Sequence, residues 1–282
     1  MEPICDLHTH STYSDGTLSP EGLICLAQER GISAVALCDH NTVAGLPALL
    51  EAAAGSGVEA VPGIEFSTDY RQTELHILGL FIKPQNYSAV TEKLEQMLRW
   101  KEQSNLDLVA ALRAAGVELD YDSIKAGTPG GQVNRAVIAA DLVRRGYCTS
   151  IKEAFSKWLS PRCGYFRPPR RLESRDVIRF IKSIGAVAVL AHPFLNLDEQ
   201  GLRGFLMEAV PAGLDAMEVY YPTFSEAQTA LAGQIADEFG LLPSGGSDFH
   251  GDNKPDIAMG SGRGTLAVPT EYMLQLQQRA IQ

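Results

Sequence analysis

The chain has 282 residues, 45% of them hydrophobic, with a formal net charge of −10 and a pI near 5.1. This length allows one large α/β domain with an insertion, and the hydrophobic content can fill its core. Long nucleic acid is bound through counterion release by Lys and Arg, so the negative charge argues against a long nucleic-acid partner. No apolar run reaches membrane-spanning length, so we expect no membrane partner.

The N-terminus and the cysteines predict a cytoplasmic location. Residues 1–3 lead straight into an apolar run that ends in histidines, which leaves no room for a signal peptide. The five cysteines show no C-x-x-C spacing, and Cys5, Cys25 and Cys38 lie in apolar stretches. We therefore expect reduced thiols in place of disulfides.

Short strand patterns alternate with helical patterns along the chain. The predicted strands are residues 4–7, 34–38, 59–64, 75–81, 186–191, 216–220 and 241–243. Ser19 followed by Pro20 marks one helix start and Ser174 another, while Gly31 and Gly185 mark helix ends. This order predicts a βα repeat with about seven strands.

A long stretch separates the fourth and fifth predicted strands. It shows helical patterns at residues 90–115, 136–145 and 151–158, with loops between them. We therefore predict a helical insertion subdomain at residues 85–173, and a barrel-like domain made of residues 1–84 and 174–282.

Candidate metal ligands gather at the predicted strand ends. The first strand runs into D-L-H-T-H, which places His8 and His10 on one face of an extended segment. Further strand ends carry His40 in C-D-H-N-T, Glu65 in G-I-E-F-S, His192 in L-A-H-P-F, and Asp248 and His250 in G-G-S-D-F-H. Barrels build their sites at these positions. His76 begins the fourth strand, so its inward direction is inferred from alternation alone.

All six histidines of the sequence fall in these segments, which favours one shared site over scattered structural histidines. Imidazole and carboxylate ligands without thiolate suit manganese, iron or zinc. Two neighbouring ions lower the pKa of a bridging water and can supply a hydroxide nucleophile. A nucleophilic serine is a poor hypothesis because no G-x-S-x-G elbow is present.

Three further carboxylates lie near the candidate ligands. Asp6 and Asp39 neighbour ligands in the sequence and are candidates to accept the second ring N–H of a coordinating histidine. A solvated aspartate at a strand end is the alternative. For Glu218, in the sixth strand, we expect a structural role.

Seven motifs together resemble the PHP family, named for polymerase and histidinol phosphatase. They are D-L-H-T-H, Asp15 in Y-S-D-G, D-H-N-T, G-I-E, the internal His76, A-H-P and S-D-x-H, in the family's order. The resemblance implies an α/β fold, a distorted (β/α)7 barrel with an inserted helical subdomain. It also implies two or three metal ions, with Mn²⁺ favoured and Zn²⁺ or Fe²⁺ as alternatives.

Carried over by motif, the resemblance implies three groups of metal ligands. One ion would be held by His8, His10, Glu65 and Asp248; a second by Glu65, His76 and His192; and a third by Asp15, His40 and His250. Glu65 would then bridge two ions.

The insertion offers candidate substrate contacts. Guanidinium groups bind phosphate bidentately, so Arg135 and Arg170 are candidates for a phosphate that does not react. Lys101 and Asn105 stand where the family often carries more arginine, and Asn134 stands where it often has histidine, which leaves the substrate open. The aromatic residues that could stack on a base, or pack in a core, are Trp100, Tyr121, Tyr165 and Phe166.

The resemblance implies a phosphoric monoester hydrolase acting on small nucleotides. The favoured reaction removes the 3′-phosphate of nucleoside 3′,5′-bisphosphates by attack of a metal-bridged hydroxide, giving nucleoside 5′-monophosphates. Alternatives are a 5′-3′ exonuclease on short RNA and a histidinol-phosphate phosphatase. An amidohydrolase also begins with H-x-H but normally needs a bridging lysine at mid-barrel. An inactive metal-binding structural module is disfavoured by the complete ligand set, and the sequence indicates no oligomeric state.

Overall fold

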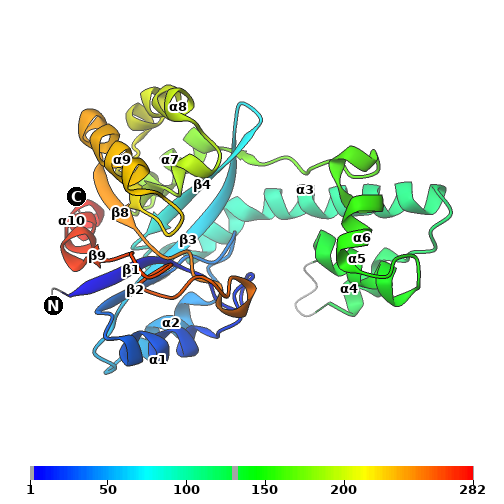
Figure 1. The fold of residues 1–282 in the computed structure, drawn as a ribbon, viewed down its shortest axis with the longest axis horizontal. Coiled ribbons are helices and arrows are strands. Elements are labelled where there is room, and N and C mark those ends of the chain that lie inside the picture. The colour runs from blue at the N-terminus through cyan, green and yellow to red at the C-terminus, as the bar shows by residue number, and fades with distance from the viewer. Residues whose placement is uncertain (1–2, 129–132, 282) are drawn as a thin grey trace. The chain divides into compact units, whose positions relative to one another are not determined.

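The structure is a computed structural model that describes residues 3–128 and 133–281. The chain divides into two compact units. The barrel unit comprises residues 1–92 and 172–282, and the insertion unit comprises residues 93–171. In Figure 1 the insertion unit is coloured from cyan-green to green.

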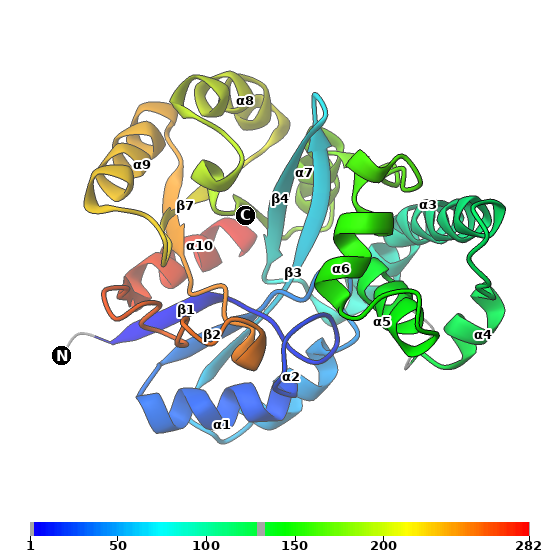
Figure 2. The same ribbon diagram turned by 45° about the vertical axis from the view of Figure 1, so that its right-hand side comes forward.

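Among the described residues, the barrel unit holds nine strands in one sheet. Their bounds are β1 Ile4–Thr9, β2 Ala34–Leu37, β3 Glu59–Tyr70, β4 Thr73–Leu80, β5 Leu172–Glu173, β6 Val187–Leu190, β7 Ala216–Tyr220, β8 Leu242–Gly245 and β9 Val268–Pro269. The strand order is β8-β7-β6-β4-β3-β2-β1-β9, and β5 pairs with β3. A parallel bridge between Thr9 and Phe249 joins the end of β1 to the segment after β8. The expected α/β barrel is confirmed, because β1 to β4 and β6 to β8 nearly close into a ring (Figure 2).

The expected βα repeat is wrong at one point, between β3 and β4. These strands form an antiparallel hairpin, with Tyr70 paired to Thr73 and no helix between them. The turn residues Arg71 and Gln72 both have left-handed φ values, 52° and 69°, as a two-residue hairpin turn requires. Because β4 is antiparallel to both β3 and β6, its first residues lie at the barrel end where the parallel strands finish.

Helices cover the outside of the barrel (Figures 1 and 2). They are α1 Pro20–Arg30, α2 Leu46–Ala53, α7 Ser174–Ser183, α8 Glu199–Ala212 and α9 Glu226–Phe239. A further helix, α10 Thr270–Ile281, lies across one end of the barrel (Figure 2), and the 3₁₀ turns are η1 Pro84–Asn86, η5 Pro193–Leu195 and η6 Gly251–Asn253. The predicted limits of α1 are confirmed, since Ser19 caps it and Gly31 ends it with a φ of 66°. Glu173, not Ser174, caps α7, because the Ser174 hydroxyl is buried 2.8 Å from that of Thr68.

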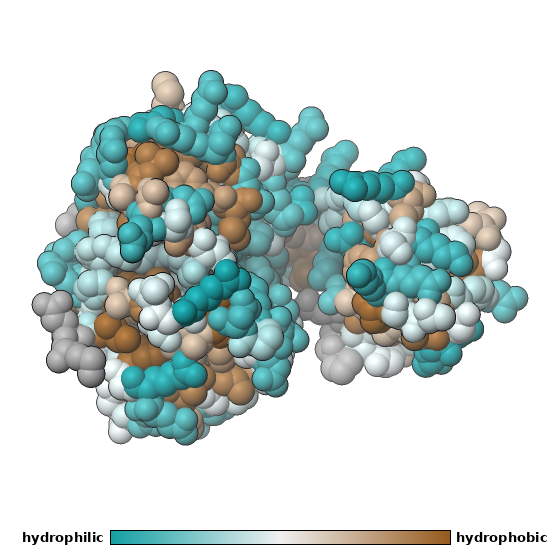
Figure 3. Space-filling view, viewed as in Figure 1, coloured by the Kyte–Doolittle hydropathy of each residue, from teal (hydrophilic) through white to brown (hydrophobic). Residues whose placement is uncertain are grey.

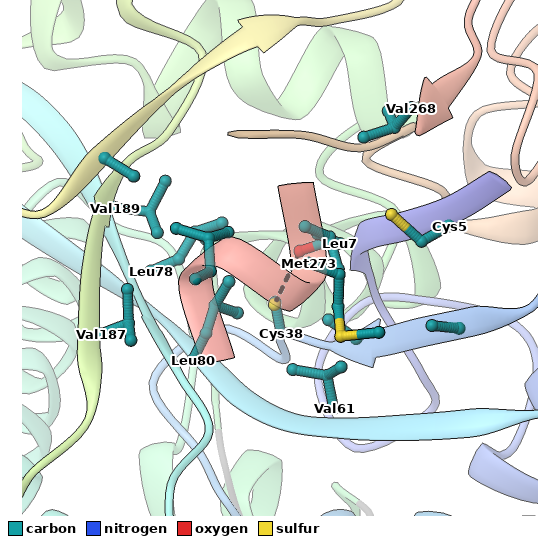
Figure 4. Close-up of a cluster of buried hydrophobic side chains, with 14 of the residues drawn as sticks. Cys5, Leu7, Cys38, Val61, Leu78, Leu80, Val187, Val189, Val268 and Met273 are labelled. Carbon is teal, nitrogen blue, oxygen red and sulfur yellow. Dashed lines mark hydrogen bonds between the residues drawn. The ribbon is translucent and has the colours of Figure 1, made fainter. Parts of the chain in front are cut away.

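Apolar side chains fill the barrel end at which the parallel strands begin. The residues labelled in Figure 4 are Cys5, Leu7, Cys38, Val61, Leu78, Leu80, Val187, Val189, Val268 and Met273. Met273 and Leu276 come from α10, which contacts β1, β6 and β8 and so closes this end. Each fully buried aliphatic side chain contributes about 1.5–3 kcal/mol.

The inward face of the sheet changes from apolar to ionisable along the barrel. Side chains alternate along a strand, so Glu65 on β3 shares the inward face with Val61. On β4, His76 shares it with Leu78 and Leu80. The apolar end therefore supports a second end that carries histidines and carboxylates.

The insertion unit has its own helices and its own core. Its elements are α3 Tyr87–Ala114, which begins in the barrel unit, α4 Tyr121–Ala126, α5 Arg135–Arg144, α6 Ile151–Ala154, the π-helical turn η3 Phe155–Leu159 and the 3₁₀ turn η4 Pro161–Cys163. The sequence did not predict α4, a six-residue helix capped by Asp120. Leu108, Leu112, Ile138 and Leu142 are fully buried in this core.

Hydrophilic side chains surround the hydrophobic patches on the face seen in Figure 3. The large hydrophobic side chains exposed on the barrel unit include Leu195, Met207 and Leu274. No helix in the described ranges is long and apolar enough to span a membrane.

Asp6 on β1 ties the barrel together as a buried carboxylate. Its Oδ1 accepts from the backbone N–H of Ser247 at 2.8 Å and of His8 at 3.3 Å. Its Oδ2 accepts from the Ser247 hydroxyl at 2.5 Å and from Gly260 N–H at 2.7 Å. An amide at this position cannot accept on its nitrogen, so a buried donor loses its partner.

We predict that Asp6→Asn lowers the free energy of unfolding by about 2–3 kcal/mol, measured by urea denaturation. Asp237→Ala, on the exposed face of α9, is the control and should change it by less than about 0.5 kcal/mol. Equal effects of the two substitutions would contradict this account of Asp6.

Candidate metal centre

The structure brings all nine predicted ligands to one end of the barrel unit, with Glu65 in the middle. Glu65 Oε2 lies 3.3 Å from His8 Nε2, 3.3 Å from His10 Nε2 and 3.0 Å from His40 Nδ1. The other oxygen, Oε1, lies 2.7 Å from His76 Nδ1 and 3.0 Å from His192 Nε2. One buried carboxylate therefore contacts five imidazoles.

A second group of ligands forms around Asp15. Its carboxylate lies 3.2 Å from His250 Nε2, 3.7 Å from His10 Nδ1 and 3.8 Å from His40 Nε2. Asp248 Oδ1 lies between the two groups, 3.2 Å from His10 Nε2. His10 thus has one ring nitrogen facing each group, whereas the sequence motifs assigned it to a single ion.

Buried lone pairs without partners show that these residues fit metal ions. Among the described residues, His8 Nε2, both ring nitrogens of His10, His40 Nδ1 and Glu65 Oε2 are buried and make no hydrogen bond. An unsatisfied buried polar atom costs about 1–3 kcal/mol. Imidazole nitrogens and carboxylate oxygens are transition-metal ligands. They form three sets here, and within each set the ligand atoms lie within 4.8 Å of one another.

Backbone hydrogen bonds fix the ligands in place. His10 N–H donates to the Phe249 carbonyl at 2.9 Å, and Asp248 N–H donates to the His8 carbonyl at 2.8 Å. Asp248 and His192 have left-handed φ values of 53° and 30°, conformations that cost about 1–3 kcal/mol each. Such strain persists only where the surrounding structure enforces it.

Gly246 permits the close approach of the segment after β8 to β1. A Cβ atom at this position would lie 2.4 Å from the His8 backbone nitrogen and 2.9 Å from Asp6 Oδ1. No other residue fits without displacing His8.

The charges of the site shift the pKa values of its groups in opposite directions. Burial raises the pKa of Glu65, but the surrounding histidines, His76 foremost, outweigh it and hold that pKa well below its usual range. Burial lowers the pKa of His76, but Glu65 raises it to about 10. For His40, burial prevails and lowers the pKa to about 4. The carboxylates are therefore ionised and attract cations.

The sequence analysis expected a structural role for Glu218, whereas the structure places its carboxylate against two of the predicted ligands. Its Oε1 lies 2.9 Å from His8 Nδ1, and its Oε2 accepts from the His192 backbone N–H at 2.6 Å. A carboxylate that accepts the ring N–H at Nδ1 leaves the Nε2 lone pair facing Glu65, as is common beside metals. Strand alternation indicates an inward position for Glu218 on β7, and in the structure the residue is fully buried.

Asp6 and Asp39 do not take the role suggested for them. The hydrogen bonds described for Asp6 go to backbone N–H groups and a hydroxyl. Asp39 accepts from the Ser11 N–H at 2.8 Å, the Ser11 hydroxyl at 2.6 Å and the Ser14 hydroxyl at 2.5 Å. Both residues brace the loops that carry ligands instead of orienting imidazoles.

Two residues that the sequence analysis did not single out hold Asp248. The hydroxyl of Tyr221 donates to Asp248 Oδ2 at 2.7 Å, and the ammonium of Lys254 donates to the same oxygen at 2.6 Å. Because Oδ2 is occupied, Oδ1 is left to face the histidines. Tyr221 directly follows β7 and Lys254 follows η6, and neither belongs to a recognisable motif.

Two predicted substrate contacts hold the insertion unit together. Asn105 is buried, and its Nδ2 donates to the Val133 carbonyl at 2.9 Å. Asn134 caps α5, its Oδ1 accepting from Val137 N–H at 3.0 Å. These two hydrogen bonds give Asn105 and Asn134 structural roles that require no bound substrate.

The three predicted cationic contacts differ in their surroundings. Arg135 lies over the ring of Phe166 at 4.2 Å, and one of its N–H groups donates to the Leu159 carbonyl at 3.3 Å. Lys101 is half-buried, and burial lowers its pKa. Arg170 is exposed. Of the aromatic residues proposed to stack on a base, Tyr121 and Phe166 are buried in the core of the insertion unit.

Known proteins resemble the chain over most of its length. A model of the PHP domain family matches residues 6–159. The 5′-3′ exoribonuclease of Haemophilus influenzae is 33% identical over 246 residues, covering 87% of this chain and 89% of that protein. The 3′,5′-nucleoside bisphosphate phosphatase of Chromobacterium violaceum is 29% identical, with coverages of 87% and 86%. A solved structure from Bifidobacterium adolescentis, assigned as a metal-dependent phosphoesterase, has a TM-score of 0.79 at 25% identity and covers 99% of this chain and 98% of its own.

We predict that Tyr221→Phe weakens Mn²⁺ binding about tenfold or more, because Asp248 loses a donor that fixes its carboxylate. Tyr220→Phe is a matched control, since that hydroxyl pairs with Tyr272 at 3.2 Å instead of with a ligand. The measurement is the Mn²⁺ dissociation constant by titration calorimetry. If the two variants bind Mn²⁺ alike, Tyr221 does not support the centre.

Proposed function

Because the chain belongs to the PHP family, we propose that its metal centre acts on small nucleotides and removes the 3′-phosphate of nucleoside 3′,5′-bisphosphates, giving nucleoside 5′-monophosphates. The chain is a metal-dependent phosphoesterase and therefore a hydrolase. The five cysteines are free thiols, which suits the cytoplasm that we propose as its location.

The observation that carries the proposal is a small pocket directly against the ligand cluster. Its volume is about 290 Å³, and its lining includes Glu65, His76, His192, Asp248 and Lys254. A pocket of this size accepts a phosphate with part of a small molecule, not a groove-bound polymer. The formal charge of −10 also argues against a long nucleic-acid substrate, because long polyanions need an extended basic surface.

We further propose that two or three ions, Mn²⁺ in preference to Zn²⁺ or Fe²⁺, are held by the nine ligands that the sequence predicted. Bound metal ions would activate water and neutralise charge on the phosphoryl oxygens. The chain's own residues prepare the site: Glu218 orients His8, and Tyr221 with Lys254 orients Asp248.

The insertion unit is the proposed source of contacts to the second phosphate. Arg170 is exposed and carries a fixed positive charge, so it is the leading candidate. Arg135 is the second candidate and Lys101 a third. Asn105 and Asn134 are weaker candidates because their side chains already make hydrogen bonds within the insertion unit.

A second candidate function is 5′-3′ exonuclease activity on short RNA. It is favoured by the Haemophilus influenzae exoribonuclease, which is more similar in sequence than the bisphosphate phosphatase, at 33% against 29% identity. Both substrates present a phosphate ester to the same metal centre, so the ligands cannot separate them.

The substrate proposal predicts an order of kcat/KM values at one salt concentration. A nucleoside 3′,5′-bisphosphate should exceed histidinol phosphate by about tenfold or more because it carries a second phosphate for the proposed arginine contacts. It should exceed long RNA by a similar factor because the pocket is small and the chain is acidic. Activity on long RNA should also fall steeply with added salt.

Each alternative outcome has a distinct meaning. A short 5′-phosphorylated RNA as the best substrate would replace the phosphatase proposal by the exonuclease. Histidinol phosphate as the best substrate would overturn the nucleotide assignment and leave the metal chemistry intact. Long RNA as the best substrate would show that the argument from net charge is wrong.

A further inference from the structure

We propose that Lys254 is a phosphate-binding residue supplied by the barrel unit itself, placed to hold a phosphoryl oxygen of the ester bound at the metal centre. This inference rests on the proposed phosphoesterase site but not on the identity of the nucleotide. It adds to that site a protein cation that neither the sequence motifs nor the metal ligands contain.

The position of Lys254 is the first reason. It lines the pocket of about 290 Å³ together with Glu65, His76 and His192, and no other Lys or Arg is among the described residues that line it. Its ammonium reaches Asp248 Oδ2 at 2.6 Å, so it stands at the edge of the ligand cluster. Its side chain is 38% exposed, which leaves it accessible from the pocket.

The turn that precedes Lys254 is hydrogen-bonded to the loop that carries Asp15. Asp252 N–H donates to the Thr17 hydroxyl at 2.9 Å, and Asn253 Nδ2 donates to the Asp15 carbonyl at 2.7 Å. Lys254 N–H closes the 3₁₀ turn onto the Gly251 carbonyl at 3.1 Å. These hydrogen bonds therefore fix the backbone position of Lys254, although its side chain is partly exposed.

Donor counting separates Lys254 from Tyr221. The Tyr221 hydroxyl has one donor, which Asp248 uses, and the side chain is buried. An ammonium has three donors, and the contact with Asp248 uses one of them. Two N–H groups thus remain for oxygens of a ligand in the pocket. Lys254 can therefore contact Asp248 and a ligand oxygen at the same time, whereas Tyr221 cannot donate to both.

The chemistry selects a phosphate monoester dianion or inorganic phosphate. The pocket is lined by the carboxylates of Glu65, Glu74 and Asp248, which repel a free anion. A cation in direct contact with the phosphoryl oxygens offsets this repulsion through charge-assisted hydrogen bonds. The effect is greater for a dianion than for the monoanion of a diester.

The test measures phosphate binding and metal binding separately. Inorganic phosphate is titrated into Mn²⁺-loaded protein by calorimetry, and Mn²⁺ into metal-free protein, for wild type, Lys254→Met and Lys254→Arg. Lys83→Met, an exposed lysine of the same unit, is the control. We expect Lys254→Met to weaken phosphate binding about tenfold or more and Lys254→Arg to recover most of that affinity. The Mn²⁺ dissociation constant should rise by a clearly smaller factor than the phosphate dissociation constant, because Tyr221 still holds Asp248.

Two outcomes would overturn the proposal. One is unchanged phosphate affinity in Lys254→Met; the other is a loss of Mn²⁺ affinity as large as the loss of phosphate affinity, which would make Lys254 a positioning residue like Tyr221. If Lys254→Met does not fold, Lys254→Gln, which keeps a donor and removes the charge, carries the test. Because phosphate is common to every candidate substrate, failure here is distinct from failure of the nucleotide assignment.

Discussion

A carboxylate with no exposed surface must be balanced by the groups around it, and Glu65 is such a carboxylate at the centre of the barrel. Its two oxygens meet the rings of five histidines. Several ring nitrogens there are buried without hydrogen bonds, so imidazoles alone do not complete the site. Cations bound by these ring nitrogens and by Glu65 would complete the cluster and stabilise it.

The barrel meets this requirement because its inward-facing residues differ between the two ends of the strands. The inward residues are apolar where the parallel strands begin, and α10 seals that end with Met273. The inward residues are ligands where those strands finish. The reversal of β4 belongs to the same plan, because it brings His76 into the ligand end from the start of a strand. The packed end therefore holds in place the strands that carry the ligand cluster.

Much of this could be predicted from the sequence because strand ends and ligand types are local features. His8, His10 and Glu65 could be placed by motif and strand period, and the structure brings them together. The reversal of β4 could not, since it depends on the left-handed turn at Arg71 and Gln72, which resembles an ordinary polar loop. The contacts of Glu218 with His8 and of Tyr221 with Asp248 join residues distant in sequence, so only the folded barrel reveals them. Lys254 lies six residues from Asp248 but belongs to no recognisable motif. Asn105 and Asn134 illustrate the opposite difficulty, as polar residues in an insertion serve helix caps as readily as substrates.

The central claim is that the ligand cluster holds more than one metal ion and needs Glu65 to do so. The direct measurement is the metal content of protein purified without chelator, by elemental mass spectrometry, for wild type, Glu65→Gln and the exposed control Glu29→Gln. The account predicts more than one transition-metal equivalent per chain in wild type and in the control, and loss of metal with loss of phosphatase activity in Glu65→Gln. Full metal content in Glu65→Gln, or full wild-type activity after exhaustive chelation, would contradict it.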